Sequence, residues 1–390
     1  MSRLTDARNA VGVSFFMNGA CFATWVARLP EIRHRLELSN GQLGAVLLAG
    51  SIGSILALTG AGALIERYGA ATAVRIGVAV DTLGMIGLAV GAVLLDSAPA
   101  VAVSLFVWGL GMGLWDVSMN VEGAGVEHGL ERTIMPRFHA LFSLGSVVGA
   151  GVGAVTTRLD VPMLVVLPVA AVAIFAAVQA TTGAFLPRDV EELDHAPRGM
   201  VLAAWREPRT LLIGLMVLAL ALTEGAANDW LAIALVDGHD VAPWMGVAGF
   251  ALFVTAMTTG RFLGTGLLDR FGRAATLWGT MALAAVGVVL VVYGPSAVLV
   301  GAGIVLWGIG ASLGFPVGMS AAADDPVRAP ARVSVVSTIG YTAFLTGPPV
   351  LGFIGDRVGA LNALLLISIL LVPAAALVPA ARKPVAAARA

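Results

Sequence analysis

The stretch Gly266-Leu-Leu-Asp269-Arg270-Phe-Gly272-Arg273 ends one long apolar run and begins the next. Three other stretches repeat it: Gly62-Ala-Leu-Ile-Glu66-Arg67-Tyr-Gly69, Gly352-Phe-Ile-Gly-Asp356-Arg357-Val-Gly359 and the weaker Gly153-Ala-Val-Thr-Thr157-Arg158-Leu. Glycine permits a sharp turn, and small residues let two helices approach closely. A charged turn that recurs at wide intervals predicts a protein assembled from similar multi-helix units.

The composition is that of an integral membrane protein. Of the 390 residues, 58% are hydrophobic and 12% are charged, and the mean hydropathy is +0.92. A chain this apolar cannot cover a water-facing surface. The net charge of −1 gives no indication of a nucleic-acid partner, and the single cysteine, Cys21, excludes an internal disulfide or a thiolate metal site. We therefore expect membrane lipid around the chain, and no nucleic acid, metal or cofactor.

Twelve apolar stretches are long enough to cross a bilayer at about 20 residues per crossing. They cover residues 9–28, 40–65, 72–95, 100–121, 138–157, 162–185, 210–236, 243–268, 274–293, 297–322, 333–355 and 360–381. The one long hydrophilic connection, 187–209, falls between the sixth and the seventh. The sequence thus predicts an all-α membrane protein with an N-terminal six-helix half (1–186), a central cytoplasmic loop (187–209) and a C-terminal six-helix half (210–390).

The basic residues indicate the orientation of the spans. Most of the 23 Lys and Arg residues fall on connections that share a side with the N-terminus. The other side holds Arg28, Arg33, Arg35, Arg158 and Arg357. Because basic residues are retained on the cytoplasmic side, we expect a multi-pass protein of the cell inner membrane with both termini in the cytoplasm.

The two halves repeat each other. Trp108-Gly-Leu-Gly-Met-Gly-Leu in the fourth span matches Trp307-Gly-Ile-Gly-Ala-Ser-Leu in the tenth, and the first span around Asn18 loosely matches the seventh around Glu224. Such internal symmetry is typical of secondary transporters, whose substrate site lies between the repeats near the membrane midplane. The sequence therefore predicts two pseudo-symmetric halves that move a small molecule by alternating access.

Several motifs resemble those of a known family. The acid-Arg-x-Gly turn after the second and eighth spans, together with the twelve-span layout, resembles the major facilitator superfamily over essentially the whole chain. Three stretches are similar to its branch related to fucose permease: Trp25-Val-Ala-Arg28-Leu-Pro30, Trp115-Asp116-Val-Ser-Met-Asn120 and Phe138-His139-Ala-Leu-Phe-Ser143-Leu-Gly145. In the first turn Glu66 replaces the family's Asp, and Ala70 and Ala71 stand where basic residues are common. The resemblance implies the major facilitator fold and a sugar-like solute.

Ionisable side chains inside the spans are candidates for proton and substrate binding, because each costs roughly 2.5–3.5 kcal/mol on insertion scales. Asp116 and Asn120 are one helical turn apart and share a face, as do Glu224 and Asn228. The predicted proton- and substrate-binding residues are Asp116, Asn120, Glu224, Asn228, Asp229, Asn18 and His139. Each acid has a second interpretation as a hydrogen-bonded structural group, which is the one we prefer for Asp81.

A second group of charged residues lies at the ends of the spans. We expect these residues to control the conformation: Arg28, Glu66, Arg67, Glu122, Asp269, Arg270 and Arg273. The acid-Arg turns are predicted to bind across the cytoplasmic ends of the two halves, and Arg28 to close or line the outer opening. Glu122 is predicted to pair with Arg67 or Arg75, and Arg261, inside the eighth span, to meet an acid or helix-end carbonyls.

Other function classes fit the sequence less well. A membrane enzyme would need a catalytic cluster such as a Ser-His-Asp set, and a sensor would need a soluble signalling domain; the sequence shows neither. Multidrug/proton antiport remains the alternative, although Leu105, Phe106 and Val107 stand where such antiporters usually carry an Arg in the fourth span. We expect a monomeric, proton-coupled symporter of a small polar solute. Glu224 and Asp116 are predicted to share a central cavity, in which one of the two acids holds a proton.

Overall fold

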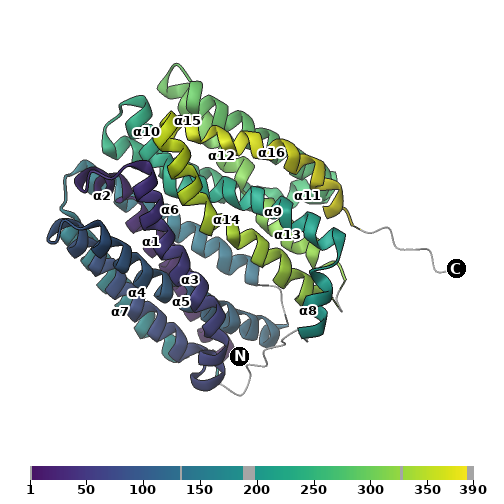
Figure 1. Cartoon of the computed structure of the whole chain (residues 1–390). Helices are drawn as coiled ribbons and strands as arrows, with labels where there is room; N and C mark the ends of the chain where they lie inside the picture. Colours follow the sequence, from purple (N-terminus) through teal and green to yellow (C-terminus); the bar gives the residue numbers. More distant parts are fainter. Residues whose placement is uncertain (1, 132–133, 188–197, 326–327, 384–390) are drawn as a thin grey trace. The chain divides into compact units, whose positions relative to one another are not determined.

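The structure is a computed structural model of the chain and describes residues 2–131, 134–187, 198–325 and 328–383 (Figure 1). All regular secondary structure in these ranges is helical. The described residues fall into two compact units. Unit 1 comprises Met1–Leu193, Leu231–Val254 and Pro348–Ala360, and unit 2 comprises Asp194–Trp230, Thr255–Gly347 and Leu361–Ala390, as far as these are described. The division into sequence halves 1–186 and 210–390 stays a prediction, and residues 188–197 of the expected central loop lie outside the described ranges.

Unit 1 contains the six spans expected in the first half of the sequence. They are α1 (Ser2–Val26), α3 (Asn40–Tyr68), α4 (Ala70–Val93), α5 (Ala98–Leu130), α6 (Met135–Arg158) and α7 (Met163–Thr181). The polar connection expected at residues 30–39 forms a short helix, α2 (Leu29–Arg35), which has a proline in its first turn. Unit 1 also includes α10 (Ala232–His239), the start of α11 (Pro243–Tyr293) and the end of α14 (Ala329–Val358).

Small residues bring the helices of unit 1 into close contact. A Cβ atom on Gly84 of α4 would lie 2.5 Å from the Cα of Trp108 on α5, so only glycine fits there. Gly145 of α6 packs in the same way against the backbone carbonyl of Phe16 on α1. Membrane helices lack a hydrophobic driving force for association, so close backbone contact of this kind holds them together.

Unit 2 contains α9 (Pro208–Ala226), α12 (Ala297–Ala311), α13 (Gly314–Ala322) and α16 (Leu365–Leu377), together with most of α11 and α14. Short helices α8 (Arg198–Ala204) and α15 (Ala360–Ala363) precede α9 and α16. The expected seventh span is interrupted by a π-helical turn at Ala227–Leu231, and the expected tenth span breaks at Ser312 and Leu313. The expected eighth and ninth spans share the label α11 (Pro243–Tyr293) but are two helices, which meet at a kink where Gly272 has a non-helical backbone.

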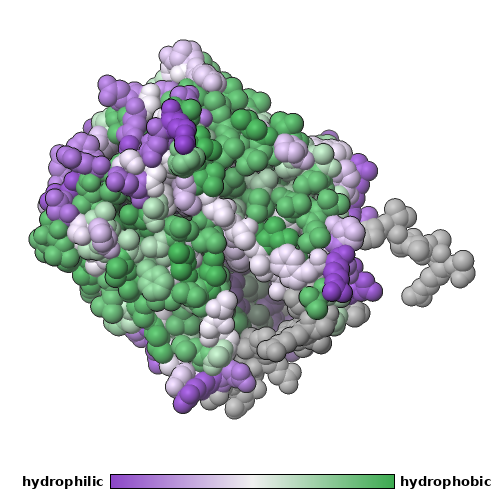
Figure 2. Space-filling model, viewed as in Figure 1, coloured by the Kyte–Doolittle hydropathy of each residue, from purple (hydrophilic) through white to green (hydrophobic). Residues whose placement is uncertain are grey.

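The prediction of an all-α membrane protein is confirmed. Eleven helical segments of the described residues are long and apolar enough to cross a membrane. The thirty-residue helix α14 covers the expected span 333–355 and supplies the twelfth crossing. Its lower apolarity comes from its Ser, Thr and Gly residues and from Pro348 and Pro349. Figure 2 shows apolar side chains along the flanks of the helices and hydrophilic ones gathered towards the helix ends, as expected of a chain surrounded by lipid.

The charged turns that recur in the sequence share a positive φ at the position after the Arg and one further residue. Gly69, Gly272 and Gly359 adopt φ values of 80°, 73° and 83°, and Asp160, at the matching position of the weakest repeat, has a φ of 51°. The ψ values of Gly69 and Gly272 are 158° and 170°, which place both in an extended region at positive φ that essentially only glycine adopts. The first and second turns therefore share one backbone conformation that requires glycine.

Candidate functional site

An ion pair between α9 and α11 lies in the membrane-spanning part of unit 2. Glu224 is at the middle of the apolar segment Pro208–His239, and Arg261 lies in the segment Pro243–Gly264. The Nη2 atom of Arg261 donates to both carboxylate oxygens of Glu224, at 3.1 and 3.0 Å. The side chains remain 25% exposed for Arg261 and 18% exposed for Glu224. We call these two residues the central pair.

The break between α12 and α13 provides the surroundings of the central pair. The Nε of Arg261 donates to the backbone carbonyl of Ser312 at 3.4 Å, so the guanidinium bridges Glu224 and the broken helix. A Cβ on Gly260 would lie 2.5 Å from the Ser312 hydroxyl, which brings α11 close to the break. On the other side, the Trp307 indole donates to the Thr223 carbonyl at 3.0 Å and fixes α12 against α9. We expected Arg261 to meet an acid or helix-end carbonyls, and the structure gives it a partner of each kind.

Asn228 and Asp229 lie just beyond Glu224, in the π-helical turn Ala227–Leu231. Both side chains are half-buried. Single π-helical turns inside α-helices are frequent at functional sites. Unit 2 therefore places three of the predicted binding residues, Glu224, Asn228 and Asp229, within two helical turns of one another.

The predicted binding residues of the first half lie in unit 1. Asn120 donates through Nδ2 to the Asp116 carbonyl at 2.8 Å and to its carboxylate at 3.3 Å, so the predicted shared face is present. The exposed His139 ring meets the buried Phe15 ring edge-on, with centroids 5.2 Å apart. Asn18 is fully buried on α1, and neither of its amide atoms has a hydrogen-bond partner among the described residues. The thiol of Cys21 donates to Asp81 at 3.0 Å, which gives this acid a structural partner.

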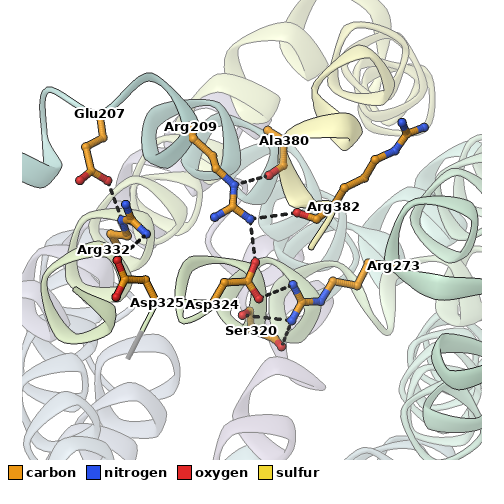
Figure 3. Close-up of polar contacts among 9 residues, drawn as sticks. All are labelled: Glu207, Arg209, Arg273, Ser320, Asp324, Asp325, Arg332, Ala380 and Arg382. Atoms are coloured by element: carbon orange, nitrogen blue, oxygen red, sulfur yellow. Dashed lines mark hydrogen bonds and ion pairs between the residues drawn. The ribbon is translucent and has the colours of Figure 1, made fainter. Parts of the chain in front are cut away.

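A cluster of ion pairs occupies the end of unit 2 that the sequence assigns to the cytoplasm (Figure 3). Its centre is Asp324, whose two carboxylate oxygens accept hydrogen bonds from Arg209 and Arg273, each at 2.7 Å. Arg273 also donates to the Ser320 hydroxyl at 2.9 Å. Arg209 donates to the carbonyls of Ala380 and Arg382 and so joins α9 to the end of the last span. We call Asp324, Arg209 and Arg273 the Asp324 cluster.

Glu207 forms a second set of ion pairs beside the Asp324 cluster. It accepts from Arg332 at 2.6 Å and from the exposed Arg328 at 3.2 Å. The hydrogen bond from Arg332 is the main cause that lowers the pKa of Glu207 below its ordinary value of 4.5. At Asp324 burial opposes ionisation, but the hydrogen bonds and charges of Arg209 and Arg273 outweigh it and lower the pKa below 3.8. Both carboxylates are therefore ionised near neutral pH.

At the corresponding end of unit 1, a carboxylate accepts from a backbone N–H and an arginine donates to a hydroxyl. The buried Glu122 accepts from the Leu186 backbone N–H at 2.6 Å, and the Arg75 Nε donates to the Thr182 hydroxyl at 2.8 Å. The pairing of Glu122 with Arg67 or Arg75 stays a prediction. In the acid-Arg turns, Arg67 lies over the Tyr68 ring and Arg270 over the Phe271 ring, each at 5.2 Å from the centroid. Each Arg side chain therefore lies over the aromatic residue that follows it in the same turn. Glu66 and the exposed Asp269 stand directly before these arginines in the chain.

At the opposite end of unit 1, segments from both halves of the sequence meet. Arg28 is buried and donates to Glu31, Thr156 and the Val161 carbonyl at 2.7, 2.9 and 3.3 Å. Arg33 forms an ion pair with Asp237 of α10. Asp356, the acid of the third charged turn, accepts from the Ser39 hydroxyl at 3.2 Å and from the Gly41 N–H at 3.0 Å. A carboxylate at this position stabilises the N-terminus of α3.

Comparison with known proteins decides the family. No protein-family model matches the chain. A Yersinia pestis protein described as an uncharacterized MFS-type transporter is 32% identical over 350 residues, which cover 88% of each chain. The chain belongs to the major facilitator superfamily (MFS). As a member of the MFS it is a multi-pass membrane transporter and not an enzyme.

Solved structures of MFS proteins have the same fold. A variant of the nucleoside transporter NupG superposes with a TM-score of 0.78 at 14% identity, over 96% of this chain and 99% of NupG. A variant of the E. coli fucose:proton symporter FucP gives 0.63 at 15% identity, over 95% of this chain and 97% of FucP. At such low identity the likeness shows the MFS fold alone.

Sequence reasoning missed part of these clusters. Asp324 and Arg209 are 115 residues apart in the chain, and no spacing rule brings them together. Asp237 was not recognised as a partner of Arg33 for the same reason. One signal was available for the Asp324 cluster: Arg273 directly follows the Gly272 turn, where the first turn has Ala70.

Proposed function

We propose that the protein is a proton-coupled transporter of a small polar solute, with a sugar-like solute as the first candidate. The observation that carries the proposal is the central pair, in which Glu224, at the middle of its membrane-spanning segment, meets the opposite charge of Arg261 and both side chains remain partly exposed. One proton on Glu224 removes one of these charges. The guanidinium of Arg261 then becomes available to another partner, so protonation and solute binding are linked at one site.

The remaining features of the chain agree with this function. The similarity in fold to a fucose:proton symporter and a nucleoside transporter supports a small polar solute. Asn228 and Asp229 in unit 2, and Asp116, Asn120 and Asn18 in unit 1, offer further polar groups for binding. In this proposal the protein works as a monomer by alternating access in the cell inner membrane, with both termini in the cytoplasm.

The test is solute-driven proton movement. Purified protein is reconstituted into liposomes that contain a pH-sensitive dye, and L-fucose, D-glucose, D-glucuronate and uridine are added outside in turn, with protein-free liposomes as the control. We expect at least one of these solutes to acidify the lumen as it enters. Proton release from acid-loaded liposomes on addition of ethidium, with no response to the polar solutes, would favour multidrug/proton antiport. No response to any of them would contradict proton-coupled transport of this class of solute.

A further inference from the structure

The guanidinium of Arg261 carries a full positive charge that a neutral sugar cannot compensate. It lies in an apolar span and is held by a carboxylate that a proton can neutralise. Exchanging an internal ion pair for well-packed hydrophobic residues is often neutral or stabilising, so folding alone does not account for a charge at this position. Both side chains of the pair are also partly exposed, so another molecule can reach them. These properties fit a binding group that exchanges its partner.

The geometry points to a solute carboxylate that replaces Glu224 on Arg261, which makes the substrate a sugar acid. This inference rests on the proposed function and names the solute class for the same site. Guanidinium groups recognise carboxylates through two parallel N–H···O bonds. In the central pair one nitrogen, Nη2, donates to both carboxylate oxygens of Glu224, at 3.1 and 3.0 Å. A solute carboxylate held by two guanidinium nitrogens at once would make the stronger pair.

The charge of the site favours one carboxylate over a phosphate. Glu224 carries a single negative charge when ionised, and it compensates the single positive charge of Arg261. A monoanionic carboxylate takes over the same compensation, whereas a phosphate dianion would leave an uncompensated charge in the membrane, which is costly. Among the described residues, Arg261 is the charged group that contacts Glu224. The other titratable side chains nearby are Asp229, in the π-helical turn that follows α9, and Tyr341 on α14.

The surroundings of the pair suit a hydroxylated ring. Asn228 lies one turn beyond Glu224 and is half-buried, so its amide can both donate to and accept from hydroxyl groups. Tyr341 of α14 is 38% exposed and lies between the Phe315 and Phe344 rings, at 5.9 and 6.4 Å. Phe344 packs directly against Gly225, the residue after Glu224. Aromatic side chains with a few polar groups are typical of small-molecule sites.

Binding of the anion together with a proton leaves the charge of the site unchanged. Before binding, ionised Glu224 and Arg261 sum to zero. After binding, neutral Glu224, Arg261 and the solute carboxylate also sum to zero. One proton and one sugar acid therefore cross together without net charge movement. A neutral sugar with one proton would instead leave the site positive and would carry charge across the membrane.

The experiment compares D-glucuronate with D-glucose, which differ only in a carboxylate in place of a hydroxymethyl group. Binding to the purified full chain is measured by calorimetry at pH 7.5. We expect Glu224→Gln to tighten glucuronate binding about tenfold, because the competing carboxylate is gone, and Arg261→Gln to weaken it at least about tenfold. Arg261→Lys, which keeps the charge but not the fork, should fall between the parent and Arg261→Gln. Arg328→Gln, at an exposed arginine outside the site, is the matched control and should change nothing.

Glucose binding should respond to none of these variants by more than about twofold. In liposomes, glucuronate uptake should follow the pH gradient and stay the same when a potassium gradient with valinomycin sets the membrane potential. The inference is overturned if glucuronate, galacturonate and gluconate all fail to bind folded parent and Glu224→Gln protein, or if Arg261→Gln binds glucuronate as the parent does. If the sugar acids fail in this way but a neutral sugar is taken up with protons, the sugar-acid inference is wrong and the proposed function still holds. If glucuronate binds but its uptake is not coupled to protons, Arg261 is an anion site and the proposed proton coupling is wrong.

Discussion

The two units hold their carboxylates in different ways. In the part of unit 1 formed by residues 1–187, Glu122 is held by a backbone N–H, Asp116 by the amide of Asn120, and Asp81 by the thiol of Cys21. In unit 2 the carboxylates of Glu224, Asp324 and Glu207 each contact arginine, and Asp324 contacts two. Neutral donors satisfy an acid without a second charge, whereas an arginine pair depends on ionisation of the acid. Unit 1 has arginine–carboxylate pairs as well, Arg28 with Glu31 and Arg33 with Asp237, but these lie at its expected outer end. Within the spans and at the expected cytoplasmic ends, the described arginine–carboxylate pairs are therefore those of unit 2.

Removing the shared acceptor of the Asp324 cluster should have the largest effect on stability. Asp324→Asn leaves Arg209 and Arg273 without their carboxylate, and we expect a loss of about 3 kcal/mol in the free energy of unfolding. Glu122→Gln in unit 1 keeps a side-chain acceptor for the Leu186 N–H and should cost about 1 kcal/mol. Thermal unfolding of both purified variants beside the parent measures the difference. Equal losses for the two substitutions would remove the contrast between the units.

The same cluster should give unit 2 a distinct response to acid. Because the pKa of Asp324 is lower in the folded than in the unfolded protein, its contribution to stability is complete above the ordinary value of 3.8. That contribution is lost as the pH falls through the lower folded pKa. The stability gap between the parent and Asp324→Asn should thus be constant from pH 7 to about pH 5 and should narrow below 3.8. A stability difference between the parent and Asp324→Asn that increases below pH 3.8 would contradict this predicted pH dependence.

The charged turns should respond alike in both units, because their backbone is shared. A Cβ on Gly69 or Gly272 would meet nothing within 4 Å, so the cost of alanine there is the positive φ alone. We expect Gly69→Ala and Gly272→Ala to lower the free energy of unfolding by roughly 1–3 kcal/mol each, because both positions lie in a backbone region that essentially only glycine adopts. Differential scanning calorimetry of the two variants checks this, and a much larger cost at Gly272 would tie the turn itself to the Asp324 cluster.

Local rules predicted a large part of this molecule from its sequence. The lengths of the apolar stretches predicted the spans, and the glycines predicted the charged turns. The helical period predicted that Asn120 lies beside Asp116. The cost of a charge in lipid predicted that Arg261 would meet an acid or helix-end carbonyls, although it did not identify Glu224. Contacts between distant segments escaped prediction, because the pairing of Asp324 with Arg209 depends on how the helices pack. The break at Ser312 escaped it as well, since the sequence there is apolar and continues a helical pattern.

Proton coupling at the central pair predicts different behaviour for two substitutions of Glu224. Liposomes with the parent, Glu224→Gln or Glu224→Ala are assayed for exchange and for pH-driven accumulation of the radiolabelled solute that the proton-movement assay selects. Gln mimics the protonated acid, so Glu224→Gln should still exchange the solute while it loses accumulation against a gradient. Glu224→Ala should also bind less well, because the hydrogen-bonding group is absent. Accumulation by Glu224→Gln equal to that of the parent would show that Glu224 is not the coupling residue, and Asp116 would then be the next acid to test.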